Sequence, residues 1–209
     1  MAKLIKILLY SITFLGGAVF LALEIVASRV LAPYFGSSIY VWGSLISVFL
    51  FALSVGYYLG GVLADRWPSF KVLALIVLCA SVLILFIPLV QMPVSRMIFS
   101  WKLDLRSSVL LASLIFFMLP SVLNGMVTPF IIKLNATQLK TIGQTVGNIY
   151  AVSTIGSVSG ALGVSFYLIP AIGTRAILFS SGGTLIATSL LSLLVDRLVA
   201  RSTNSRTTF

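Results

Sequence analysis

The chain has 209 residues, of which 59% are hydrophobic and 9% charged, and its mean hydropathy is +1.15. Soluble domains carry roughly a quarter charged residues, so this composition excludes a soluble protein and indicates an integral membrane protein. Histidine is absent and Cys79 is the only cysteine. The usual general base, histidine ligation of a metal or haem, and a disulfide or cysteine metal site are therefore excluded.

The charge is strongly basic, with 14 Lys and Arg against four Asp and Glu and a net charge of +10. The basic residues punctuate the gaps between apolar stretches and do not gather on one face, which is typical of orientation signals. We therefore expect the lipid bilayer as partner and no nucleic acid. Anionic headgroups or an acidic partner at the cytoplasmic face stay open as further reasons for the charge.

Six apolar stretches are long enough to cross a bilayer, which takes about 20 residues each. They cover residues 4–31, 39–64, 70–90, 107–132, 142–169 and 172–195, separated by connectors that contain Pro33, Gly36, Pro68 and Pro170. The first stretch is too long for a signal peptide, so we expect a retained helix. The sequence predicts an all-α membrane protein with one six-helix domain over 1–200 and a polar cytoplasmic tail over 201–209.

The distribution of Lys and Arg predicts that both termini lie in the cytoplasm. We expect the protein in the plasma (inner) membrane. The predicted cytoplasmic set is larger than the outer set. It comprises Lys3, Lys6, Arg66, Lys71, Lys133, Lys140, Arg197, Arg201 and Arg206, against Arg29, Arg96, Lys102, Arg106 and Arg175 outside. The longest outer connector, 91–106, has apolar residues at helical spacing. It is either a short helix lying in the interface or an ordinary loop with Trp101 at headgroup level.

Glu24 is the one acid well inside an apolar stretch, whereas Asp65, Asp104 and Asp196 fall at the ends of stretches or between them. A carboxylate at that depth costs several kcal/mol unless it is protonated, paired or facing a polar cavity, so Glu24 is a candidate functional residue. Arg29 lies about 140° further round the helix, which makes it a poor ion-pair partner. Glu24 shares one helical face with Tyr10, Thr13, Gly17 and Ser28, and we expect that face to point toward other helices.

Further polar residues lie within the predicted spans. The candidate ligand-binding residues are Glu24, Ser28, Tyr58, Asn124, Asn148 and Thr154. Pro120 and Pro129 flank Asn124 and should kink or loosen the fourth span. The alternative for the polar residues is helix–helix packing, and for Gly156 and Gly160, spaced as GxxxG, packing is the expected role. No cofactor motif, metal site or catalytic residue is recognisable.

Three parts of the sequence resemble a known family. They are 23–66, which ends in GYYLGGVLADR, then PSVLNGMVTPFIIKL at 120–134, and VGNIYAVSTIGSVSGALGVSFYLIPAIGTR at 146–175. Together they resemble the membrane domain of fused spermidine synthase-like proteins, a major facilitator-like region joined to an aminopropyltransferase domain. The resemblance covers most of the chain and implies a fold like one half of a major facilitator transporter.

The segment GYYLGGVLADRW is similar to the loop motif between helices two and three of major facilitator transporters. The resemblance implies that Asp65 and Arg66 make helix-end charge contacts that hold one conformation, and that Gly60 and Gly61 allow close packing. In the family an Asp-rich catalytic domain follows the membrane part, whereas this sequence stops at Phe209. With four acids and no nucleoside-binding sheet, we do not expect polyamine synthesis by this polypeptide alone.

Two functions follow as expectations, with a third behind them. The first is a transporter-like protein, or membrane subunit, of a polyamine or small-cation system, with Glu24 in a polar cavity between the first, second, fourth and fifth helices. The second is a non-transporting anchor or assembly subunit, either a homodimer or joined to a partner such as a cytoplasmic synthase-like protein. An intramembrane enzyme subunit acting on lipid or quinone ranks last.

Overall fold

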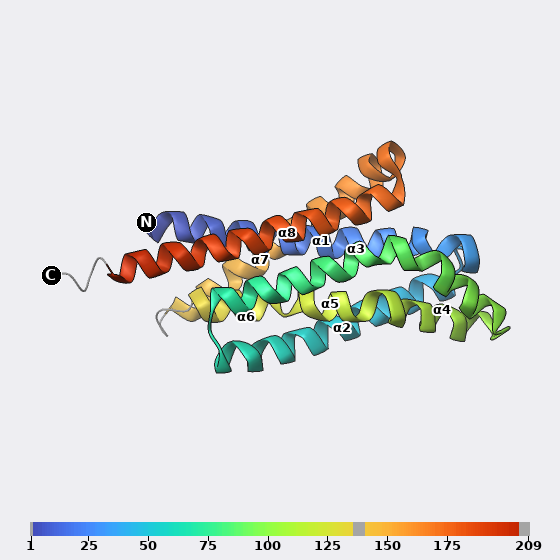
Figure 1. Cartoon of the computed structure of the whole chain (residues 1–209), viewed down its shortest axis with the longest axis horizontal. Coiled ribbons are helices and arrows are strands. Elements are labelled where there is room, and N and C mark those ends of the chain that lie inside the picture. The colour runs from blue at the N-terminus through green and yellow to red at the C-terminus, as the bar shows by residue number, and fades with distance from the viewer. Residues whose placement is uncertain (1, 136–140, 205–209) are drawn as a thin grey trace.

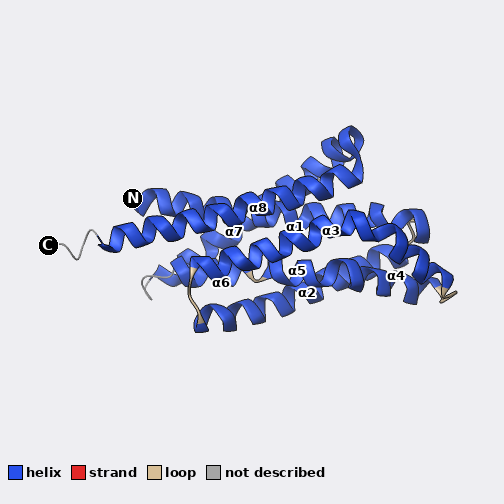
Figure 2. Cartoon of the chain, in the orientation of Figure 1, coloured by secondary structure: helices blue, strands red, loops and turns tan. Residues whose placement is uncertain are grey.

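The computed structural model describes residues 2–135 and 141–204, and these are helical apart from short connectors (Figure 2). The helices are α1 (Ala2–Phe35), α2 (Ile39–Arg66), α3 (Phe70–Ser100), α4 (Leu105–Ser113), α5 (Leu119–Gly125), α6 (Val127–Asn135), α7 (Ile142–Leu162) and α8 (Ile169–Asn204). Wider π-helical turns join α4 to α5 at Leu114–Met118 and α7 to α8 at Gly163–Leu168. The all-α class is confirmed for the described ranges, which contain no strand.

Five helical stretches of the described chain are long and apolar enough to cross a membrane. They are Lys3–Phe35, Ile39–Arg66, Phe70–Ser100, Leu105–Asn135 and Ile142–Ala200. The first four correspond to the first four predicted spans, and the fifth contains both remaining ones. Within it Gly173 has a non-helical backbone, with φ of 75° and ψ of 167°, and the chain reverses its direction between α7 and α8 (Figure 1).

Prolines explain the irregular helical turns. Each π-helical segment ends two residues before a proline, Pro120 in one case and Pro170 in the other. A proline ring has no amide to donate and clashes with the carbonyl four residues earlier. A wider turn before the proline relieves that clash without ending the helix. The expectation that prolines loosen the fourth span is therefore confirmed.

Two helices extend further than the sequence predicts. The predicted break at Pro33 is absent, since α1 continues to Phe35 and ends at Gly36, whose φ is 75° and whose amide donates to the Ala32 carbonyl at 2.9 Å. A glycine in this left-handed conformation is a common helix end. Helix α8 continues through Asn204, into the predicted tail, and residues 205–209 lie outside the described chain.

The predicted interfacial helix within 91–106 is wrong as a separate element, and so is a loop of that length. Helix α3 continues to Ser100 although Pro88 and Pro93 lie inside it, and only residues 101–104 connect it to α4. Figure 1 shows that α3 turns away from its long axis near this end. Prolines are a usual cause of such bends.

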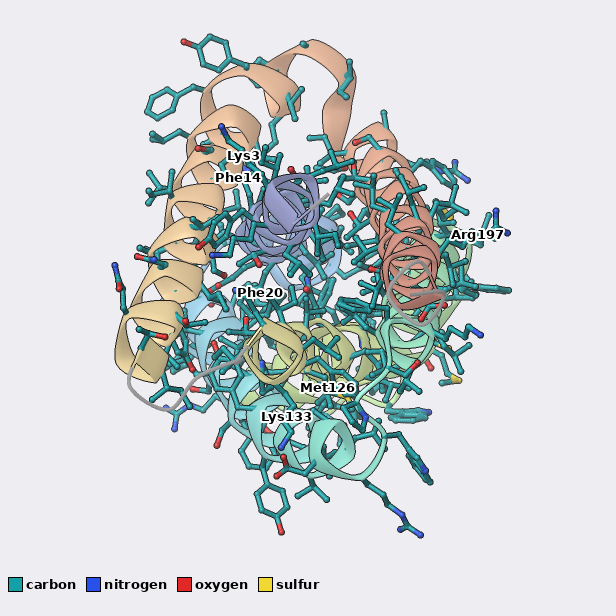
Figure 3. All side chains as sticks on the ribbon, turned by 90° about the vertical axis from the view of Figure 1, so that its left-hand side faces the viewer. Lys3, Phe14, Phe20, Met126, Lys133 and Arg197 are labelled. Carbon is teal, nitrogen blue, oxygen red and sulfur yellow. The ribbon has the colours of Figure 1, made fainter. Side chains whose placement is uncertain are left out.

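Helix α1 lies in the middle of the bundle, with α7 and α8 on either side of it in the end-on view (Figure 3). Its buried residues include Leu23, Val26 and Leu31, which join the main apolar core. The start of α1 and the end of α8 lie at the same end of the bundle (Figure 1). This arrangement surrounds α1 with neighbours and lets its polar and small residues face other helices.

Candidate functional site

A polar cavity of about 140 Å³ lies among α1, α2, α5, α6 and α7. These helices belong to the first, second, fourth and fifth predicted spans, which are the spans expected to enclose a cavity. Its lining residues are Thr13, Gly16, Gly17, Phe20, Leu21, Leu53, Tyr57, Asn124, Gly125, Val127, Thr128, Tyr150, Ser153, Thr154 and Ser157. None of these side chains is charged, so any ligand is held by neutral polar groups and aromatic rings.

Glycine allows the wall of the cavity on α1 to approach its neighbours closely. A Cβ added at Gly17 would meet the Ser153 carbonyl oxygen of α7. Side chains of the neighbouring helices donate to two α1 carbonyls: Asn124 Nδ2 to the Gly16 oxygen at 3.3 Å, and Ser157 Oγ to the Gly17 oxygen at 3.1 Å. These two bonds tie the α5 and α7 sides of the cavity to α1.

The helix break between α5 and α6 lies in the cavity wall. Helix α5 ends at Gly125, Met126 is in a turn, and α6 begins at Val127. Met126 keeps helical dihedral angles, with φ of −63° and ψ of −21°, so the break is a gap in the helical hydrogen bonds and not an unwound segment. The cavity lining includes both residues that flank Met126, so the break belongs to the site.

Aromatic rings bound the cavity on two sides. Phe20 of α1 meets Phe49 edge-on at 5.5 Å between ring centroids, and Phe49 stacks on Phe117 at 5.8 Å. Figure 3 shows Phe20 inside the bundle, between α1 and the part that contains Met126. Tyr57 of α2 and Tyr150 of α7 also line the cavity and are 38% and 43% exposed, so they stand where it meets the surface.

The structure brings together two of the six predicted ligand-binding residues and leaves four outside the cavity. Asn124 and Thr154 both line it. Tyr58 is 72% exposed, and Asn148 is exposed on α7. Glu24 and Ser28 are not among the lining residues either, and each has a different setting.

Ser28 is buried and lines a second cavity of about 300 Å³, together with Arg29 and Trp42. Its hydroxyl donates to the Ile25 carbonyl at 2.8 Å.

Glu24 is half-buried and lies seven residues beyond Gly17, about 10 Å along α1 and on nearly the same face. As expected from the helical angle, it forms no ion pair with Arg29, and no partner for it occurs in the described ranges.

The other three acids all have partners, which sets Glu24 apart. Asp65 pairs with Lys133 of α6 at 2.6 Å, and Asp196 pairs with Lys71 of α3 at 3.8 Å. Asp104 caps α4 by accepting from the Ser107 amide at 3.3 Å, and the hydrogen bonds from Ser107 lower the pKa of the Asp104 carboxyl. These contacts leave Glu24 as the unpaired acid of the described chain.

The residues of the loop motif behave differently from one another. The Arg66 guanidinium lies 4.8 Å from the centre of the Trp67 ring, so the partner of Asp65 is Lys133 and not Arg66. A Cβ added at Gly60 would crowd Met126 and Pro129, whereas Gly61 has no such neighbour. Asp65 and Gly60 thus join α2 to α6 directly.

Gly156 and Gly160 pack α7 on α1. A Cβ added at either would meet a backbone carbonyl oxygen, that of Phe14 for Gly156 and that of Ala18 for Gly160. Backbones approach this closely where a glycine leaves room for the neighbouring chain. The packing role expected for this GxxxG pair is consistent with these contacts.

Sequence reasoning missed Tyr57 and Tyr150 and singled out Tyr58 instead. The buried face of α2 is made of apolar and small residues, including Ala52, Gly56 and Gly60. Its polar residues therefore lie on the exposed side. Tyr57 is next to Gly56, which packs against the Val122 carbonyl of α5. A small residue that packs against another helix, as Gly56 does, is therefore a sequence signal that the side chain next to it lies at the edge of the helix–helix interface.

No family model matches this chain, and neither does any curated protein or solved structure. No group of three or more His, Cys, Asp or Glu residues that could hold a metal occurs in residues 2–135 and 141–204. The cavity and its surroundings therefore carry the functional argument.

Proposed function

We propose that this protein is a transporter-like membrane protein, or membrane subunit, for a small organic cation of the polyamine class. The observation that carries the proposal is the uncharged, oxygen-rich cavity beside the α5–α6 break. We propose six membrane crossings, with α7 and α8 as separate crossings on either side of Gly173. Both termini would lie in the cytoplasm of a plasma-membrane protein, and the fold would be like half of a major facilitator transporter.

The chemistry of the lining favours a ligand that donates hydrogen bonds. Thr13 Oγ1 already donates to the Leu9 carbonyl at 2.9 Å, and Ser157 Oγ donates to the Gly17 carbonyl. Their remaining capacity is as acceptors. An ammonium group offers three donors, and the rings of Tyr57 and Tyr150 add a face that attracts cations.

The size of the cavity indicates that it holds one end of such a ligand. A volume of about 140 Å³ accommodates an amine and its first carbons. Glu24, about 10 Å further along the same face of α1, would hold or attract a second positive charge. We therefore assign recognition of one ammonium group to the cavity and long-range attraction to Glu24.

The test is uptake of radiolabelled putrescine by purified protein in liposomes, with Glu24→Gln and Asn124→Leu as variants. Asn124→Leu should abolish uptake and binding, because it removes the amide from the wall. Glu24→Gln should lower uptake by at least about tenfold, since a desolvated charge interaction exceeds about 1.4 kcal/mol. Tyr58→Phe is the matched control because Tyr58 lies outside the cavity, and uptake should not change.

The proposal fails if the wild-type protein, inserted in liposomes at normal yield, shows no uptake or binding of putrescine above that of empty liposomes. It fails equally if Asn124→Leu, folded as judged by its melting temperature, transports as well as the wild type.

A second candidate function, a non-transporting anchor or assembly subunit, is favoured by a specific surface. Small and polar residues lie along one largely exposed side of α2, and on α7 two glycines have nothing packed against them. They are Gly43, Ser47, Ser54, Tyr58 and Gly61 on α2, and Gly143 and Gly147 on α7. Residues of this kind suit contact with a partner helix. The partner would be a second copy or another subunit, such as a synthase-like protein.

Oxidative cross-linking in membranes tests whether a second copy covers α2. A single cysteine is placed by Ser54→Cys in a Cys79→Ser background. If α2 packs on its counterpart, we expect a disulfide-linked dimer whose yield does not fall when the protein is diluted with lipid. Leu75→Cys, exposed on the lipid-facing side of α3, is the matched control and should stay monomeric. Equal cross-linking of the two variants would reject a homodimer through α2.

A further inference from the structure

The helix break has a specific set of unpaired oxygens. The Met126 amide donates to the Val122 carbonyl at 3.1 Å, and the Phe130 amide donates to the Met126 carbonyl at 3.4 Å. The residue that would donate to the Gly125 carbonyl is Pro129, which has no amide. The Gly125 carbonyl therefore lacks its helical donor, and Gly125 lines the cavity.

Two side-chain oxygens flank this carbonyl in the sequence and line the same cavity. Asn124 is 7% exposed, and its Nδ2 donates to the Gly16 carbonyl, which fixes the amide and leaves Oδ1 without a donor in the described chain. Thr128 is 9% exposed, and its hydroxyl makes no hydrogen bond with any described residue. Asn124 and Thr128 are four residues apart, so they share one side of the broken helix.

Buried polar atoms in native proteins nearly always have a partner, which is a protein group, a water or an ion. Elsewhere some buried hydroxyls are satisfied, as Thr188 Oγ1 is by donating to the Thr184 carbonyl at 2.8 Å, whereas the single hydroxyls of Ser38 and Ser95 have no partner in the described chain. Ser121, one turn before the break, adds a further buried hydroxyl without a partner. Ser121 does not line the cavity, but at the break three oxygens without a donor among the described residues, from Asn124, Gly125 and Thr128, belong to residues that line it together. They point to a ligand that accepts electron pairs from oxygen.

The type of oxygen restricts the ligand further. Divalent cations in proteins rely on carboxylates, and no lining residue is charged. Neutral carbonyl and hydroxyl oxygens can replace the hydration shell of a monovalent cation.

We propose that the α5–α6 break binds an alkali cation, sodium, through Asn124 Oδ1, the Gly125 carbonyl and Thr128 Oγ1. A role of this ion in coupling rests on the proposed transport function, but its binding does not. The site forms one wall of the cavity, so a bound cation would fix the break and order the residues that face the organic ligand.

The experiment is equilibrium binding of radioactive sodium to the purified full chain in detergent, without any amine present. We expect saturable binding that unlabelled sodium displaces and N-methylglucamine does not. Thr128→Val should weaken it by at least about tenfold, because it removes an oxygen bonded to a charge. Thr128→Ser keeps the oxygen and should bind within about threefold of wild type.

The matched control is Thr188→Val, which removes a buried hydroxyl from α8, a helix with no residue in the cavity. It should leave sodium binding unchanged. Non-saturable binding by the wild type overturns the inference, and so does equal binding by Thr128→Val and wild type. If Thr128→Val does not fold, the test is made with Thr128→Ser. This variant should change the preference of the site for lithium over sodium measurably, and an unaltered preference overturns the assignment.

Failure of this inference differs from failure of the proposed function. Sodium binding without putrescine uptake supports the ion site and rejects amine transport. Putrescine uptake that is unchanged when choline replaces sodium, together with no sodium binding, rejects the ion site alone.

Discussion

The α3–α8 interface and the cavity both contain buried hydroxyl groups, but the two regions use them differently. Ser81 Oγ donates to the Gly182 carbonyl at 2.7 Å, and Ser189 Oγ donates to the Ala74 carbonyl at 2.8 Å. Each of these bonds joins one helix to the other. In the cavity, the Thr128 hydroxyl has no partner in the described chain. Ser157 of the cavity also bonds across helices, to the Gly17 carbonyl, so what sets the candidate ion site apart from the α3–α8 interface is the unpaired hydroxyl of Thr128.

The outward-facing side chains of α3 and α8 also differ from those of the helices that line the cavity. The large exposed side chains in the middle of α3 and α8 are apolar: Leu75, Leu78, Val82, Phe86, Phe179, Ile186 and Leu190. These suit contact with lipid. Helices α2 and α7 also expose polar side chains, those of Ser54, Tyr58 and Asn148, whereas α8 exposes Ser180, whose hydroxyl donates to the Ile177 carbonyl. We therefore interpret α3 and α8 as the supporting side of the bundle and the cavity helices as the functional side.

The largest effect on stability should come from the α1–α7 contact that closes the cavity. Gly156→Ala places a methyl group against the Phe14 carbonyl and should destabilise the fold by about 1–3 kcal/mol through overpacking. Gly147→Ala, on the same helix with nothing within 4 Å, should be neutral or stabilising by up to about 1 kcal/mol. Thermal melting in detergent measures both, and equal shifts for the two variants would show that the close approach does not exist.

A smaller pair of effects should separate the two uses of hydroxyl groups. Ser189→Ala breaks a bond between helices and should lower the free energy of unfolding by about 0.6 kcal/mol, with sodium and putrescine binding unchanged. Thr128→Val removes an unpaired hydroxyl and should change stability less than Ser189→Ala while weakening sodium binding. Denaturant titration and binding on both variants test this. Loss of binding in Ser189→Ala would mean that the two sides are not independent.

The helices could be predicted from the sequence because long apolar stretches leave few alternatives in a membrane. The helices that enclose the cavity could be predicted from their polar residues, and Pro129 near Asn124 indicated a loosened wall, but Glu24, which was expected in the cavity, is not among its lining residues. The rotation of α2 could not be predicted, since its polar and small faces both fit helix packing. Tyr58 therefore turned out to lie on the exposed side.

Hydrogen-bond satisfaction also could not be predicted from sequence. Thr128 and Thr188 are the same residue type within apolar parts of the sequence, and only the structure shows that one hydroxyl is paired and the other is not. Glu24 is a related case: the sequence marks it as unusual, but its distance from the cavity depends on where the cavity lies along α1. Both examples concern which groups meet, which depends on helix rotation and register.

The smallest expected effects are at the ends of the helices, where each side of the bundle has one ion pair. Asp65–Lys133 joins α2 to α6 beside the cavity helices, and Lys71–Asp196 joins α3 to α8. All four side chains are at least partly exposed, so each pair should contribute no more than about 1 kcal/mol. Asp65→Asn should nevertheless loosen two helices that line the cavity, whereas Asp196→Asn should not.

The measurement is the rate at which a thiol reagent modifies Tyr57→Cys in a Cys79→Ser background. A change of about 1 kcal/mol in the equilibrium between closed and open cavity corresponds to about fivefold in that rate, which we expect for Asp65→Asn at low salt. High salt screens exposed charges, so it should reduce the difference between Asp65→Asn and wild type. The Lys71–Asp196 pair, at 3.8 Å, lies on the supporting side. An equal rise in the modification rate with Asp196→Asn would therefore show that the helix ends move together and that the division into two sides is wrong.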